Sequence, residues 1–167
     1  LASLPPSKDV MNEKPRKRTD FIINSRMAVN IIVTGVLFTS FLIMLLIVFK
    51  NMRIDSLIDL LNPVNDGSGI SSYELSLFFT IFVMLQFWNM FNAKVFDTKH
   101  SVFRQKNSGG FICIASLIII GQFLIVTFGG QMFNVTPLKT TDWFIIILIT
   151  SLVLWIKEIV RFVINHR

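Results

Sequence analysis

Four stretches of the chain are almost free of charged residues and are long enough to cross a lipid bilayer. They are Ala28–Phe49, Leu75–Phe91, Phe111–Phe128 and Trp143–Ile156, the last continuing past Lys157 and Glu158 to Ile164. As a helix, the first alone would span about 33 Å, against a hydrocarbon core of about 30 Å. The 167 residues are 53% hydrophobic and 16% charged, whereas globular proteins average about 45–50% and about 25%. The pattern excludes a water-soluble enzyme, a disulfide-stapled secreted domain and a disordered tail.

These stretches predict an all-α integral membrane protein with four transmembrane helices in one bundle. We expect the crossings at about residues 28–49, 73–95, 111–128 and 143–164. A polar, basic segment over residues 1–27 precedes the bundle, and residues 28–167 form a single domain. The lipid bilayer is then the first partner that the sequence predicts for this multi-pass chain.

The distribution of basic residues predicts the orientation of the bundle. Of the 16 Lys and Arg residues, 13 lie in residues 1–27, in the second connection or at the C-terminal end. The other three are Lys50, Arg53 and Lys139, in the first and third connections. Because Lys and Arg resist translocation, we expect both termini to be cytoplasmic. The basic stretch Lys14–Arg18 is then interpreted as an orientation signal at anionic headgroups, and no nucleic-acid partner is expected.

The second crossing is the least apolar, because it carries Gln86, Asn89 and Asn92. Residues three apart are neighbours on a helix, so Gln86 and Asn89 project toward one side and are the candidate ion-pathway residues. Hydrogen bonds between helices are the alternative, and chemistry alone favours them. In the last crossing, Lys157 and Glu158 are interpreted as anchors that reach the cytoplasmic interface, in preference to a proton relay.

The outer connection, residues 51–72, predicts a short amphipathic helix lying in the membrane interface. Ile54, Leu57, Ile58 and Leu61 would share its apolar face, and Asn62-Pro63 would end it.

No catalytic or metal-binding motif is evident in the sequence. The two histidines, His100 and His166, form no ligand pair, and Cys113 is interpreted as a buried apolar residue. There is no glycine-rich phosphate-binding motif. We therefore expect no catalytic residue, no metal site and no cofactor in this chain. The residues alone predict a four-helix membrane protein, which as a free-standing product would act as a scaffold, a subunit or a small channel.

Several sequence strings nevertheless resemble one family. LQFWNMFNAK (Leu85–Lys94) followed by HSVF (His100–Phe103) resembles the eighth transmembrane helix and following loop of calcium-transporting P-type ATPases. LASLPPS (Leu1–Ser7) resembles the segment leaving the sixth helix, and FGGQMF (Phe128–Phe133) with Trp143 resembles the loop between the ninth and tenth. The chain is identified as helices seven to ten of a plasma-membrane-type member, and a bacterial one is expected.

The resemblance implies that this chain supports the ion-carrying helices of a larger pump. In that family, helices one to six and the phosphorylation, nucleotide and actuator domains lie upstream, so the chain alone should have no activity. ATP and Mg would act in the parent pump, Ca²⁺ would be its transported ion, and the plasma membrane its location. Gln86 stands where the endoplasmic-reticulum-type branch has a glutamate of a second calcium site. An amide there supplies one oxygen and no charge, which fits a branch carrying one calcium per cycle. Met90 departs from animal members, which commonly have Glu.

Overall fold

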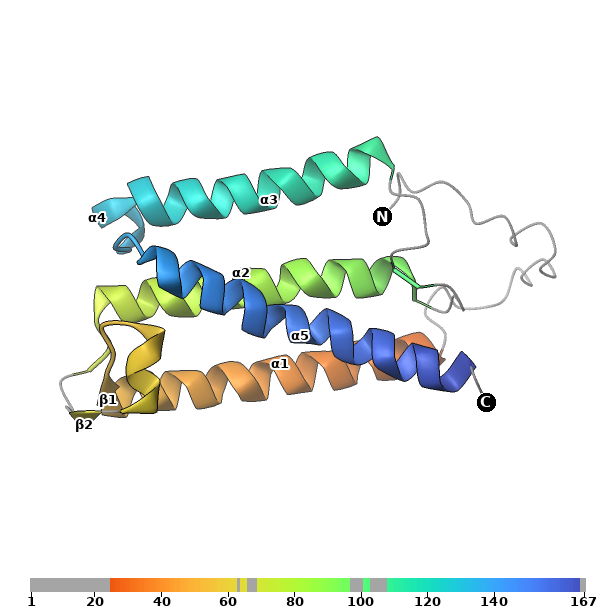
Figure 1. The fold of residues 1–167 in the computed structure, drawn as a ribbon, viewed down its shortest axis with the longest axis horizontal. Helices are drawn as coiled ribbons and strands as arrows, with labels where there is room; N and C mark the ends of the chain where they lie inside the picture. The colour runs from red at the N-terminus through yellow and green to blue at the C-terminus, as the bar shows by residue number, and fades with distance from the viewer. Residues whose placement is uncertain (1–24, 63, 66–68, 97–100, 103–107, 166–167) are drawn as a thin grey trace.

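The computed structural model describes residues 25–62, 64–65, 69–96, 101–102 and 108–165 (Figure 1). Four long helices dominate this part of the chain: α1 (Ser25–Asn51), α2 (Ser72–Lys94), α3 (Gly109–Phe128) and α5 (Thr140–Asn165). Each is long and apolar enough to cross a membrane, which confirms the predicted all-α membrane fold with four crossings. The short elements are β1 (Met52–Arg53), η2 (Leu57–Leu61), β2 (Val64–Asn65) and α4 (Gly130–Phe133). Most of the predicted segment 1–27 lies outside the described residues.

Helix α2 lies in the middle of the bundle. It contacts α1 on one side and α3 on the other, and α5 crosses it and packs against it along much of its length (Figure 1). The start of α1 and the end of α5 lie at the same end of the bundle, as an even number of crossings requires (Figure 1). We call this end the inner end and the opposite one the outer end. The assignment of the inner end to the cytoplasm stays a prediction from the charge distribution.

The buried apolar core lies where α1, α2 and α5 meet toward the outer end. Phe49, Leu77, Met84 and Ile146 are fully buried there, and partly buried side chains surround them. A second, smaller cluster of Val95, Val102 and Leu154 lies at the inner end. Most apolar side chains of α1 and α3 are instead exposed. They therefore face lipid or further helices, since lipid tails and leucine side chains are equally apolar.

The prediction of an amphipathic helix in the outer connection is wrong. The segment contains an antiparallel pair, β1 with β2, and the 3-10 helix η2. Ile54 and Leu57 are 1% and 8% exposed, but Ile58 and Leu61 are 50% and 80% exposed, so the four do not share one apolar face. The Ile54 backbone N–H donates to Glu74 of α2, and the Leu57 N–H, at the first residue of η2, donates to Asp142 of α5, so these contacts tie the segment to two helices of the bundle.

Two glycines produce the tight break between α3 and α4. A Cβ on Gly129 would lie 2.3 Å from the backbone oxygen of Ile125, and Gly130 has a φ of +45°. Any other residue would clash at the first position and be strained at the second. The Phe-Gly-Gly string therefore has a backbone reason to contain both glycines.

Cysteine labelling tests the predicted orientation. In a Cys113→Ala background, Asn62→Cys in the exposed outer connection should react with a membrane-impermeant maleimide in intact cells. Gly109→Cys, at the exposed start of α3, should react only after the membrane is permeabilised. The opposite pattern would show that the bundle is inverted.

Candidate functional site

The carboxylate of Asp142 joins three parts of the chain at the outer end. It lies in the first turn of α5 and is 0% exposed. Oδ1 accepts hydrogen bonds from Ser56 Oγ at 2.8 Å and from the Leu57 backbone N–H at 3.0 Å. Oδ2 accepts a short hydrogen bond from the Tyr73 hydroxyl, whose oxygen accepts in turn from the Lys139 backbone N–H. Asp142 thus fastens the outer connection and the start of α2 to α5.

The carboxylate of Glu74, in the first turn of α2, also fastens the outer connection to a helix. It is 1% exposed. Its Oε1 accepts from the Ile54 backbone N–H at 2.9 Å and its Oε2 from the Ser71 backbone N–H at 2.7 Å. The Ser71 hydroxyl accepts from the Glu74 N–H, which completes a capping box. The donors recorded for both buried carboxylates are N–H and O–H groups, which can stabilise a buried charge without a cation.

The sequence analysis missed both carboxylates. One local signal was available, because Ser71 followed three residues later by Glu74 matches the capping-box pattern before an apolar run. No local signal reveals Asp142, whose partner Ser56 lies 86 residues earlier.

Hydrogen bonds between α2 and its neighbours continue through the middle of the bundle. Gln122 of α3 donates through Nε2 to Thr80 Oγ1 at 3.2 Å. Trp88 Nε1 donates to Thr150 Oγ1 of α5 at 3.1 Å. Inside a membrane such groups are costly unless they are paired. These pairs therefore specify which faces of α3 and α5 turn toward α2.

The two candidate ion-pathway residues lie three positions apart on α2 but differ in burial. Gln86 is exposed, on a face of α2 that also exposes Phe79 and Phe82. Asn89 is partly buried, and its Oδ1 accepts a hydrogen bond from Lys157 Nζ at 3.5 Å. The same ammonium donates to Thr34 Oγ1 at 3.2 Å. Lys157 therefore bridges α1, α2 and α5. The sequence had predicted instead that its side chain reaches the membrane interface as an anchor.

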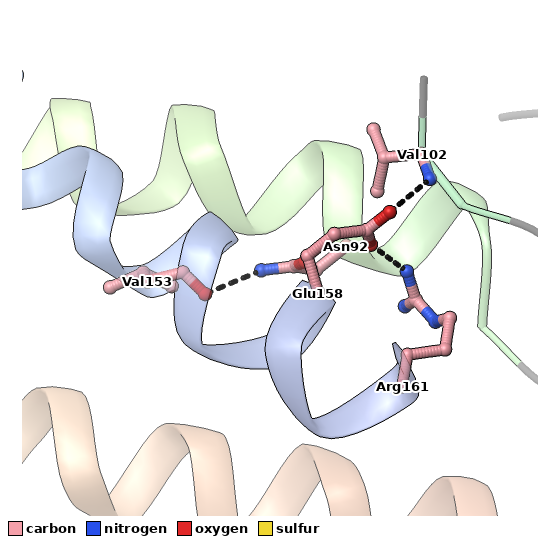
Figure 2. A network of polar contacts seen from close by, with 5 residues as sticks. All are labelled: Asn92, Val102, Val153, Glu158 and Arg161. Atoms are coloured by element: carbon pink, nitrogen blue, oxygen red, sulfur yellow. Dashed lines mark hydrogen bonds and ion pairs between the residues drawn. The ribbon is translucent and has the colours of Figure 1, made fainter. Parts of the chain in front are cut away.

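At the inner end, a network of polar contacts joins α2 and the connection after it to α5 (Figure 2). Asn92 donates through Nδ2 to the Val153 carbonyl at 3.1 Å, while its buried Oδ1 has no hydrogen-bond partner. Glu158 accepts from the Val102 backbone N–H at 3.1 Å and forms a salt bridge with Arg161 at 2.5 Å. The carboxylate thus holds the connection after α2 against α5, and its predicted role as an anchor at the cytoplasmic interface stays a prediction.

The described residues do not combine into a catalytic or metal centre. In that part of the chain, no three His, Cys, Asp or Glu side chains are arranged to hold a metal ion. An apolar groove of about 590 Å³ lies along α5 beside α2, with Trp88, Leu148 and Trp155 in its walls. In the part of the chain that the structure describes, most polar side chains inside the bundle are hydrogen-bonded, and α2 has an open face formed by Phe79, Phe82 and Gln86.

Comparison with known proteins identifies the family. Residues 1–163 match the family model described as "Cation transporting ATPase, C-terminus". The chain belongs to the cation-transporting ATPase family. The matched part of the family is its C-terminus, and with the four apolar helices this makes the chain a multi-pass membrane protein.

Curated relatives from animals, fungi and plants share about 30% of the aligned residues. Human plasma membrane calcium-transporting ATPase 3 is 29% identical over 149 residues, covering 86% of this chain and 12% of that protein. Calcium-transporting ATPase 2 of Cryptococcus neoformans is 31% identical over 163 residues, covering 96% and 11%. Calcium-transporting ATPase 9, plasma membrane-type, of Arabidopsis thaliana is 31% identical over 161 residues, covering 96% and 14%. The chain thus spans only about an eighth of the length of these relatives.

Replacing Asp142 by Asn should loosen the outer end. An amide presents an NH₂ group to donors that now bond to carboxylate oxygens, and an unpaired buried donor costs about 1–3 kcal/mol. We expect a lower melting temperature and faster hydrogen exchange at the Leu57 amide.

Asp55→Asn is the matched control, because Asp55 lies in the same connection but is exposed. Equal hydrogen-exchange rates of the Leu57 amide in Asp142→Asn and Asp55→Asn would contradict the assigned role of Asp142.

Proposed function

We propose that this chain is the C-terminal transport-domain segment of an ATP-driven calcium pump of the plasma membrane and supports the helices that carry the ion. The observation that carries the proposal is the open face of α2. Helix α2 is the central helix of the bundle, yet Phe79, Phe82 and Gln86 are exposed on it. A central helix that exposes an amide on this face needs a further group to cover that amide.

The cost of an exposed amide supports this interpretation. An amide side chain within the hydrocarbon core is unfavourable unless it is hydrogen-bonded or faces an aqueous path. The amides of Asn89, Asn92 and Gln122 each form a hydrogen bond to a neighbouring helix, whereas Gln86 is exposed. Gln86 is therefore placed to meet a group supplied by another part of a longer polypeptide, which we propose to be the first six membrane helices.

The relatives supply the class of reaction. They are named calcium-transporting ATPases and are about eight times longer than the aligned region. In the proposed pump, nucleotide binding, phosphorylation and Mg²⁺ belong to the upstream domains, and Ca²⁺ is the transported ion. Gln86 and Asn89 remain the candidate ion-pathway residues of this segment, and we propose no metal site formed by this chain alone.

Calcium uptake by the complete polypeptide tests the function. Reconstituted in vesicles, it should accumulate Ca²⁺ only when ATP and Mg²⁺ are supplied. Absence of ATP-dependent uptake, or a native product no larger than the 19.1 kDa of this chain, would contradict the proposal. The latter result would instead favour a free-standing scaffold, subunit or channel.

Substitutions on the open face test the supporting role. Phe82→Ala should lower the rate of Ca²⁺ uptake several-fold, because it removes a large side chain from the proposed contact with the ion-carrying helices. Leu124→Ala removes a comparably exposed apolar side chain from α3, and uptake should be unchanged. Equal effects of the two variants would show that the α2 face has no special role.

A further inference from the structure

Lys157 places a positive charge inside the membrane-spanning part of the bundle. It lies eight residues before Asn165, the last residue of α5, which is about 12 Å along the helix axis. The side chain is partly buried, and its ammonium donates to Thr34 and Asn89. Both acceptors are neutral. A charged group at this depth is costly and marks a functional position by default.

The neighbouring carboxylate does not neutralise this charge. Adjacent residues on a helix do not face each other, and Glu158 is turned toward Val102 and Arg161 (Figure 2). The other buried carboxylates of the described chain, Glu74 and Asp142, are engaged at the outer end. Lys157 therefore presents a nearly uncompensated charge to the partly buried side of α2.

The contact with Asn89 also occupies a potential ligand. An amide oxygen is a good ligand for hard cations, and Asn89 lies one turn from the open face of α2 that carries Gln86. Its Oδ1 already accepts from the ammonium. A divalent cation approaching Asn89 would have to displace the ammonium and overcome its repulsion, which is strong in a medium of low dielectric constant.

From these contacts we infer that Lys157 is a specificity-determining residue that keeps transported cations away from Asn89. The inference rests on the proposed function, because it concerns a cation moving past α2. Lys157 acts through charge and through its occupation of Asn89 Oδ1, and it confines any bound cation to the remaining part of the pathway. A purely structural bridge would hold three helices together and leave cation binding unaffected.

Equilibrium Ca²⁺ binding to the complete polypeptide tests the inference. Lys157→Met removes the charge and keeps an apolar side chain of similar length, so Ca²⁺ should bind at about tenfold lower free concentration. Lys157→Arg keeps the charge and should bind as the unchanged protein does. Adding Asn89→Leu to Lys157→Met should abolish the gain, because the freed oxygen is then absent.

A second variant covers the case in which Lys157→Met does not fold. Lys157→Gln removes the charge but keeps an amide that can donate to Thr34 and Asn89, so it should also shift binding to lower free Ca²⁺. The thermal unfolding of each variant is measured in parallel to separate stability from binding. Folded variants that bind Ca²⁺ as the unchanged protein does would overturn the inference alone. No Ca²⁺ binding and no uptake by the unchanged protein would overturn the proposed function, and this inference with it.

Discussion

Polar groups within a bilayer must find their hydrogen-bond partners inside the protein, and this requirement determines the arrangement of the bundle. The polar side chains that join the helices almost all involve α2, the least apolar of the four spans. Thr80 binds α3, Trp88 and Asn92 bind α5, and Glu74 binds the outer connection. Because its amides and hydroxyls need partners on several sides, α2 takes the centre. The more apolar α1 and α3 occupy the periphery, where their apolar side chains can contact lipid tails.

The crossings could be predicted from the sequence because their signal is local. An uninterrupted apolar run of sufficient length has one stable solution in a membrane, which is a helix. The outer connection lacks this property. Its conformation depends on Asp142. This residue accepts a hydrogen bond from the Leu57 backbone N–H, which lies 85 residues earlier in the chain. The spacing of Ile54, Leu57, Ile58 and Leu61 predicted one amphipathic helix, whereas the structure has a short 3-10 helix that begins at Leu57 and excludes Ile54.

The candidate site could be predicted only in part for a related reason. Spacing correctly placed Gln86 and Asn89 on neighbouring positions of one helix. It could not reveal that α5 crosses near Asn89 and brings Lys157 to it, while Gln86 stays open. The crossing point of two helices depends on packing along their whole lengths. The sequence of a single span contains no information about that crossing point.

The uneven distribution of polar groups also bears on how the chain is assembled during synthesis. Helices α1 and α3 are apolar enough to enter the lipid as single segments. Helix α2 leaves the ribosome before α5, which supplies acceptors for its Trp88 and Asn92. Until α5 has been made, these side chains must be accommodated by the insertion machinery or by helices already in place. The bundle thus matures in an order different from that of its sequence, and its central helix is the last to be fully packed.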